Sequence, residues 1–214
     1  MSSRKLTRRD AGQLISLGLA GWGVSQVLQA WQPLGRDVSR SGAAQLILSD
    51  RSAPSSGPAN ANLTIAVFTD YQCPACRKAH FEMERALSED GRVRVLYKDW
   101  PIFGRVSERA ARVALAADRQ GIYAQVHGRL MTRVAALNDA TLEAAVIEAG
   151  GDWQRIINDL SGFGRVIDLQ LAVTRGQVFS LNISGTPAYL IGDQLIEGAL
   201  TQRQFRRAFA AARS

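Results

Sequence analysis

Cys73 and Cys76 are the only cysteines among the 214 residues of this chain, and Pro74 and Ala75 separate them. The pair directly follows a strand-like apolar run, Leu63–Thr69, and stands where a helical pattern begins. Two thiols one helical turn apart can close and reopen a disulfide. At a helix N-terminus, the helix dipole and the free backbone N–H groups favour a thiolate over a thiol. The pair therefore predicts a strand–turn–helix unit with thiol–disulfide chemistry at the turn.

The order of the two cysteines predicts their roles. Cys73 lies nearer the helix start, so we expect it to be less covered and to act as the attacking thiolate. Cys76, one turn into the helix, is then the resolving thiol that closes the redox disulfide Cys73–Cys76. Pro74 and Ala75 form the active-site loop between them.

Two other uses of the cysteines are open alternatives. A zinc site would combine Cys73 and Cys76 with His80 and His127, but His80 follows on the same helix and His127 has no partner at ligand spacing. A purely structural disulfide would close only a short loop, which stabilises a fold by about 2 kcal/mol at most. The residues favour a redox pair, and we predict neither a bound metal nor a cofactor.

The net charge of +7 is unevenly distributed. Residues 1–40 carry six basic and two acidic side chains, which gives +4, and the other residues carry twenty and seventeen, which gives +3. The basic composition therefore owes much to the N-terminal segment. Because no run of basic residues is interleaved with aromatic residues, we predict no nucleic-acid partner.

The N-terminus has the pattern of an export signal. Basic residues at positions 4–9 precede an uncharged stretch, Ala11–Gly35. Residues 1–31 are predicted to be a signal peptide or an N-terminal membrane anchor, and residues 11–31 are long enough to span the inner membrane. Whether the segment is cleaved, and whether it follows the Tat or the Sec route, stays open. Either reading places the rest of the chain in the periplasm or cell envelope, where disulfides form.

Residues 32–62 are predicted to be a linker, because Ser49–Asn62 is rich in Ser, Pro, Gly and Asn and poor in apolar residues. The folded domain is expected over residues 63–214. Its predicted strands are 63–69, 92–98, 188–191 and 194–197, the last two joined by a turn at Gly192-Asp193. Its predicted helices are 74–88, 107–119 (capped by Ser107), 122–134, two short helices capped by Asp139 and Asp152, 165–179, and a final helix opened by the capping box at Thr201.

In order, these elements form a β-α-β unit, a helical block and a β-β-α unit. We therefore predict an α/β protein with a thioredoxin-like fold and an inserted all-helical domain at about residues 104–182. Cys73 falls where the first strand leads into its helix, which is a usual place for a site in such folds.

Thr186 and Pro187 precede the third predicted strand and form a second candidate site element. An X–Pro bond has a low cost in the cis form, and proline leaves a backbone edge without an N–H group. Such an edge can pair with an extended substrate segment, so we predict that Thr186 and Pro187 bind substrate. An ordinary trans-proline turn is the alternative.

These segments together resemble the DsbA-like family of thioredoxin-fold thiol:disulfide oxidoreductases. The matching pieces lie within residues 63–212 and are Phe68–Cys76, Tyr97–Gly104, Gly121–His127 and Gly185–Asp193, followed by Glu197-Gly198. The resemblance implies an extracytoplasmic enzyme with Cys73 as nucleophile and Pro187 in cis beside it. It also implies that the helical insertion caps the active site.

The chain departs from the best-known oxidases of that family at two positions. Ala75 stands where they carry a histidine that lowers the cysteine pKa, and Val67 stands where they carry a buried acid. Asp70 is expected to be a turn or capping residue. Lys98 and Asp99 are expected either near the site or as a charge pair at the end of a strand.

The predicted function is that of a protein thiol:disulfide oxidoreductase working as an oxidase. Its expected partners are cysteine-containing exported proteins as substrates and a membrane redox partner that resets the cysteine pair. The alternatives are a disulfide reductase or isomerase, and a metal-binding module that uses the two cysteines.

Overall fold

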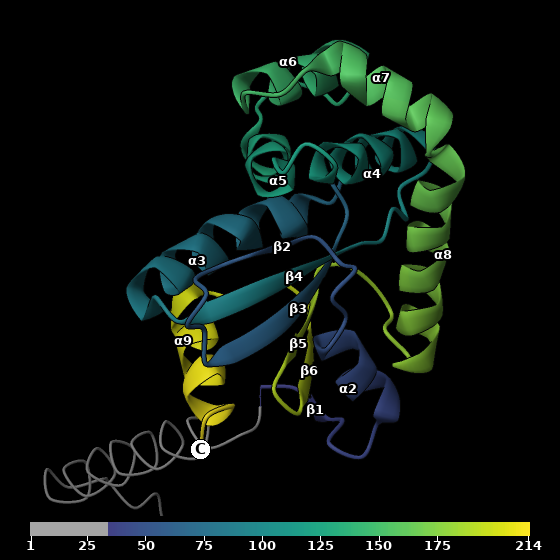
Figure 1. Ribbon diagram of the computed structural model, residues 1–214. Coiled ribbons are helices and arrows are strands. Elements are labelled where there is room, and N and C mark those ends of the chain that lie inside the picture. Colours follow the sequence, from purple (N-terminus) through teal and green to yellow (C-terminus); the bar gives the residue numbers. More distant parts are fainter. Residues whose placement is uncertain (1–33) are drawn as a thin grey trace, which may run out of the picture. The chain divides into compact units, whose positions relative to one another are not determined.

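A six-stranded mixed sheet forms the centre of the computed structural model, which describes residues 34–214 (Figure 1). In sheet order the strands are β1 (Arg36–Asp37), β6 (Gln194–Glu197), β5 (Ala188–Ile191), β3 (Leu63–Thr69), β4 (Val93–Asp99) and β2 (Ser55–Ser56). Strands β3 and β4 are parallel and every other pair is antiparallel.

Helices cover both faces of this sheet. They are α2 (Gly42–Leu48), α3 (Pro74–Asp90), α4 (Arg105–Asp118), α5 (Tyr123–Thr132), α6 (Asp139–Glu148), α7 (Trp153–Gly162), α8 (Gly164–Ser180) and α9 (Gln202–Ala211). Helices α3 and α9 pack together on one face, and α2 and α8 pack on the other (Figure 1). Helices α4 to α8 are inserted between β4 and β5, as a thioredoxin-like fold with a helical insertion requires, which confirms the predicted fold class.

The apolar run of β3 is buried from end to end because helices cover both of its faces. On one face, Ala66 and Phe68 join a buried cluster with Ile47 of α2 and Val178 of α8. On the other face, the neighbouring strand β5 presents Tyr189, whose ring meets that of Phe205 of α9 edge-on at 5.0 Å. The two layers hold β3 rigidly, and β3 leads directly into the cysteine pair.

Local sequence signals account for most element boundaries. Gly91, in the left-handed conformation with φ +67°, ends α3. Gly192, with φ +55°, turns β5 into β6 at the predicted position. Asp152 caps α7, and Thr201 forms the predicted capping box of α9 with Gln204. Asp139 instead begins α6, whose cap is the preceding Asn138.

The prediction of a linker over residues 32–62 is wrong for the part that the structure describes. Residues 36–37 pair with β6, and residues 55–56 pair with β4. Between them, Ser41 caps α2, which buries Ile47 in the core cluster. Short edge strands depend on backbone hydrogen bonds and need little apolar side-chain area, so composition does not reveal them.

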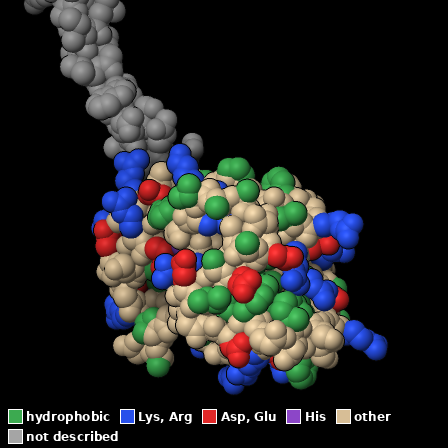
Figure 2. Space-filling view, turned by 90° about the horizontal axis from the view of Figure 1, so that it is seen from above, with side chains coloured by type: hydrophobic (Ala, Val, Ile, Leu, Met, Phe, Trp, Pro, Cys, Tyr) green, Lys and Arg blue, Asp and Glu red, His purple; other side chains and the backbone are tan. Residues whose placement is uncertain are grey.

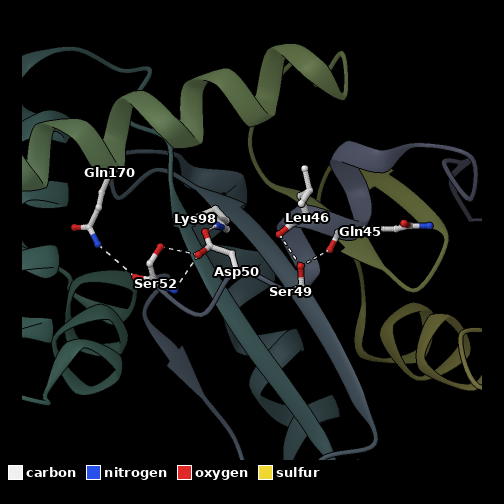
Figure 3. A network of polar contacts seen from close by, with 7 residues as sticks. All are labelled: Gln45, Leu46, Ser49, Asp50, Ser52, Lys98 and Gln170. Atoms are coloured by element: carbon white, nitrogen blue, oxygen red, sulfur yellow. Dashed lines mark hydrogen bonds and ion pairs between the residues drawn. The ribbon is translucent and has the colours of Figure 1, made fainter.

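A polar network ties this N-terminal segment to the rest of the sheet (Figure 3). Asp50 forms an ion pair with Lys98 of β4, whose side chain is only 3% exposed. The Ser52 hydroxyl donates to Asp50 Oδ1 over 2.6 Å, and Gln170 of α8 donates to the Ser52 carbonyl over 3.4 Å. Burial opposes ionisation of Asp50, but the hydrogen bonds from Lys98 and Ser52 outweigh it and lower its pKa to about 2.

Opposite charges alternate on the face over the helical insertion (Figure 2). Within the helical insertion, Arg109 and Asp139 form an ion pair of 3.0 Å, and Arg129 and Glu148 form another of 3.4 Å. The basic side chains on this face are therefore interspersed with acidic ones.

The predicted signal or anchor, residues 1–31, lies outside the described residues. None of the helices described within residues 34–214 has the length and hydropathy needed to cross a bilayer.

Candidate active site

Cys73 is the N-cap of α3 and joins the end of the sheet to the helix. Its sulfur accepts a hydrogen bond from the backbone N–H of Cys76 over 3.2 Å. Pro74 occupies the first helical turn, where its missing N–H costs nothing. Both cysteines are free, so the site is in its dithiol form. Both cysteines are buried, with exposed fractions of 2% for Cys73 and 3% for Cys76, so these fractions do not distinguish the two thiols.

The surroundings of the two sulfurs shift their pKa values in opposite directions. The pKa of Cys73 falls from 9.0 to about 6, chiefly through the hydrogen bond from the Cys76 side chain and despite burial, which opposes the shift. The Thr186 side chain and the backbone N–H groups of Cys76 and Ala75 lower it further. The hydrogen bond to Cys73 and burial raise the pKa of Cys76. Cys73 is therefore the thiolate of the pair near neutral pH, and Cys76 holds the proton.

The loop before β5 faces Cys73 from the far end of the chain. The Thr186–Pro187 peptide bond is cis, as predicted. The Thr186 carbonyl oxygen lies 3.4 Å from the Cys73 sulfur. The Pro187 carbonyl accepts from the backbone N–H of Gly198 over 2.8 Å, which ties this loop to the end of β6. The fold thus brings together the two motifs that the sequence singled out.

Asp70 is a turn residue, as expected, but its carboxylate does more than close the turn. It is 1% exposed and accepts four hydrogen bonds. The donors are the backbone N–H of Gln72 (2.7 Å), those of Ile102 (2.7 Å) and Phe103 (3.0 Å), and the Ser107 hydroxyl (2.6 Å). The buried Asp70 carboxylate therefore joins the cysteine turn, by hydrogen bonds, to the loop that precedes the helical insertion.

Ser107 corrects one predicted helix boundary. It was predicted to cap a helix, but α4 already begins at Arg105, and the buried Ser107 hydroxyl binds Asp70 instead. A serine near the start of a helix can either cap that helix or bind a residue far away in the sequence. The sequence alone does not distinguish these two roles.

Lys98 and Asp99 do not pair with each other. Successive residues of a strand point to opposite faces, so Lys98 reaches Asp50 on the α2 and α8 side of the sheet. On the opposite side, Asp99 accepts a hydrogen bond from the Tyr123 hydroxyl of α5 over 2.8 Å. The predicted charge pair at the strand end is wrong, and only Asp99 shares a face with Thr69 and α3.

His80 and His127, considered above as zinc ligands, come from α3 and α5 and lie side by side, with ring centroids 5.4 Å apart. His127 Nδ1 lies 3.1 Å from the Tyr71 hydroxyl. Within residues 34–214, no group of three or more His, Cys, Asp or Glu side chains is arranged to hold a metal ion. Sequence reasoning missed the contacts among Tyr71, Tyr123 and His127, although two of these residues lie in the matching segment Gly121–His127.

Comparisons with known proteins agree with this geometry. The family model described as DSBA-like thioredoxin domain matches residues 64–210. A thioredoxin-like oxidoreductase from Silicibacter pomeroyi is 32% identical, with a TM-score of 0.73 over 78% of this chain and 95% of that chain. The thiol-disulfide exchange protein alpha-DsbA2 from Wolbachia pipientis is 25% identical, with a TM-score of 0.73 over 78% and 90% of the two chains. The catalytic domain of Proteus mirabilis ScsC is also 25% identical, with a TM-score of 0.69 over 78% and 93%.

The curated relatives are much longer proteins. The Na(+)/H(+) antiporter NhaA 3 of Salinispora tropica is 26% identical over 148 residues, which are 66% of this chain but 22% of that protein. NhaA 1 of Salinispora arenicola is 23% identical over 145 residues, again 22% of its length. The chain therefore spans about a fifth of the curated relatives that it matches. Since the family model covers well over half of the chain, this protein belongs to the family described as DSBA-like thioredoxin domain.

Proposed function

We propose that this protein is an extracytoplasmic thiol:disulfide oxidase that introduces disulfides into cysteine-containing exported proteins. The observation that carries the proposal is the Cys73 sulfur at the N-terminus of α3, hydrogen-bonded by Cys76 and with its pKa lowered to about 6. Stabilising the thiolate of the reduced pair makes the disulfide form more oxidising, because it stabilises the reduced form relative to the disulfide. The N-terminal export pattern supports a periplasmic or cell-envelope location.

The reaction begins with the Cys73–Cys76 disulfide. A substrate thiolate attacks the Cys73 sulfur, forms a mixed disulfide and releases Cys76, which takes up a proton. The second substrate thiolate attacks its partner sulfur in the mixed disulfide and releases Cys73 as the thiolate. The substrate has then lost two electrons and the enzyme pair has gained them. A membrane partner that carries its own disulfide accepts these two electrons and resets the pair.

The surroundings of Cys73 suit an extended apolar segment of substrate. Thr186 and Pro187 place a backbone edge beside the sulfur, and Pro187 contributes no N–H group to it. Ile102 and Phe103 lie in the loop whose backbone N–H groups bind Asp70, and Val106 lies at the start of α4; all three side chains are exposed. These residues form an apolar rim for the side chains on either side of the substrate cysteine.

The proposal predicts a low midpoint for alkylation of Cys73. The rate of its reaction with iodoacetamide should rise with pH around a midpoint near 6, because only the thiolate reacts. Cys76→Ser removes the thiol that contributes most to the shift, so this variant should have a higher midpoint. Mass spectrometry of the labelled peptide identifies the reacting cysteine. A wild-type midpoint near the ordinary value of about 8.5 would contradict the proposed activation.

The direction of exchange is tested separately by the reduction potential. The protein is equilibrated with glutathione redox buffers, and the reduction potential of the cysteine pair is determined. We expect a value above that of thioredoxin, about −270 mV, and closer to that of the strongest oxidases, about −120 mV. The fraction of reduced protein can be measured by the mass added on thiol labelling. A potential at or below about −270 mV would instead assign the pair to a reductase.

A further inference from the structure

Two arginines lie next to each other close to the cysteine pair, one on α3 and one at the end of α5. Arg77 directly follows Cys76, and its backbone N–H donates to the Cys73 carbonyl over 3.2 Å, so it lies one helical turn after Cys73. Arg133 directly follows α5, which lies over the N-terminal end of α3 (Figure 1). The exchange reaction described above gives neither arginine a role. Two like charges held together cost free energy, so their position requires an explanation.

Backbone carbonyls hold both guanidinium groups in place. Arg77 Nε donates to the Met131 carbonyl over 3.2 Å, and a second nitrogen of Arg77 donates to the carbonyl of Arg133. Arg133 in turn donates to the carbonyl of Leu130. These carbonyls belong to the last turn of α5 and the residue after it, where a helix leaves its final carbonyls without internal partners. The arginines thus join the end of α5 to the start of α3.

These bonds do not neutralise the two positive charges. The C-terminus of a helix carries only about half a negative charge. Neither arginine forms an ion pair with a carboxylate among residues 34–214. The charge of Asp70 acts on Arg133, but the Asp70 carboxylate accepts its four hydrogen bonds from other groups. Positive charge therefore remains in excess beside the cysteine turn.

One nitrogen of the pair is a buried donor without an acceptor. Arg133 Nε is buried and has no hydrogen-bond partner in the part of the chain that the structure describes. Burial and the charge of Arg77 lower the pKa of Arg133, and Asp70 opposes them, but an arginine stays protonated at neutral pH. A buried charged donor that is left unpaired is costly. A negatively charged acceptor would satisfy this donor and offset the repulsion between the two arginines.

The arginine pair can be reached from solvent. Both side chains are half-buried, and the residues on either side of Arg133 are exposed, Thr132 in part and Val134 by 99%. Pro74, which follows Cys73 at the start of α3, is exposed as well. The start of α3 and the end of α5 therefore form a surface that a polypeptide segment bound at Cys73 can cover.

A carboxylate matches the chemistry and the position of these groups. Each guanidinium is a planar fork of N–H donors that can bind both oxygens of a carboxylate. Arg77 lies four residues after Cys73, which is about 6 Å along α3. In an extended segment, a residue two positions from the substrate cysteine lies about 7 Å from it along the strand. An acidic side chain at that spacing therefore reaches the arginines while the substrate cysteine lies at Cys73.

We propose that Arg77 and Arg133 form a carboxylate-binding subsite that selects substrate segments with an acidic side chain about two residues from the reacting cysteine. The inference rests on the proposed thiol–disulfide exchange and adds a substrate preference to it. The arginines contribute to binding and take no part in the exchange of sulfur bonds. Because the subsite needs the end of α5, the helical insertion takes part in the choice of substrate.

Reduced peptides with two cysteines test this preference. Matched peptides carry glutamate or glutamine two residues before, or two residues after, the first cysteine, and the disulfide form of the protein oxidises each of them. At one of these positions the second-order rate constant should be about tenfold higher for the glutamate peptide than for the glutamine peptide. The ratio should fall as the ionic strength rises, because salt screens a charge pair that is open to solvent. At saturating peptide the two rates should converge, because the arginines act on binding alone.

Two variants and a matched control distinguish a local subsite from general attraction between charges. Arg133→Gln and Arg77→Gln should each lower the glutamate-to-glutamine ratio to about 1, while the glutamine peptide keeps its rate within about twofold. Arg129→Gln removes the same charge from α5 itself, in an arginine that pairs with Glu148, and should keep the full ratio. Taking the ratio within each variant cancels the effect of the glutamate on the thiol of the peptide.

Equal rate constants for the glutamate and glutamine peptides at both positions in the wild type would overturn the inference. The same loss of preference in Arg129→Gln would also overturn it, because the attraction would then not be local. If one of the two test variants does not fold, the other decides. A wild-type protein that oxidises neither peptide would instead contradict the proposed oxidase function, and the same ratio is then measured with oxidised peptides and reduced protein.

Discussion

Cys73→Ser is expected to abolish disulfide exchange, whereas Cys76→Ser is expected to keep the first half of the reaction. Hydrogen bonds from Cys76 and the start of α3 lower the pKa of Cys73 to about 6, so we expect Cys73 to be the thiolate that attacks and is attacked. Without Cys76, the mixed disulfide between Cys73 and a substrate that has a single cysteine has no second thiol to resolve it, so that complex should accumulate.

The measurement is the oxidation of a reduced two-cysteine peptide by the disulfide form of the wild type and by each variant after treatment with a small disulfide, together with non-reducing electrophoresis. Cys73→Ser should leave the peptide at its uncatalysed rate of oxidation and should trap no complex. Cys76→Ser, first charged with a small disulfide at Cys73, should form with a single-cysteine peptide a complex that a reductant dissolves. Catalysis by Cys73→Ser, or trapping through Cys76 alone, would reverse the assignment of the two roles.

Ile47→Ala should lower the free energy of unfolding by about 2–5 kcal/mol, the usual cost of removing a large aliphatic side chain from a core. Ile47 is fully buried where α2 packs on β3, in the same cluster as Phe68. The loss should therefore be felt by the whole sheet, in a single cooperative transition, even though residues 32–62 have the composition of a linker.

Leu46→Ala is the matched control, because Leu46 is the neighbouring residue of the same helix and is 72% exposed. Its effect on the free energy of unfolding should stay within about 0.5 kcal/mol. Urea titrations followed by tryptophan fluorescence compare the two variants. Equal, small effects would show that α2 does not contribute to the stability of the domain.

The cysteine site was predictable because its signals are local. A strand, a proline-led helix start and two cysteines follow one another within fourteen residues, from Leu63 to Cys76. The turn between β5 and β6 and the capping box of α9 were equally predictable, since each depends on a few neighbouring residues whose backbone or side-chain chemistry has one main use. The place of Thr186 and Pro187 beside Cys73 came from the resemblance to a known family, and the structure places their loop there.

The surroundings of the site were not predictable in the same way. The four hydrogen bonds of Asp70 reach as far as Ser107, and Tyr71 meets His127 across 56 positions of sequence. Asp99 was expected near the site or in a charge pair, and only the pairing of β3 with β4 decides which side chains share its face. These contacts depend on how α5 and β4 are packed, and no local pattern encodes that.

Sequence alone determined the chemistry of this protein: a reactive thiol pair at the start of a helix, within an α/β chain interrupted by helices. Tertiary structure alone decided what surrounds that pair, including the edge strands built from residues that resemble a linker and the buried contacts among Asp99, two tyrosines and the histidines of α3 and α5. The physical reason is the distance along the sequence over which the deciding interactions act. Helix starts, turns and caps are settled by interactions within a few residues, whereas burial and the pairing of ionisable groups arise only when distant segments exclude water together.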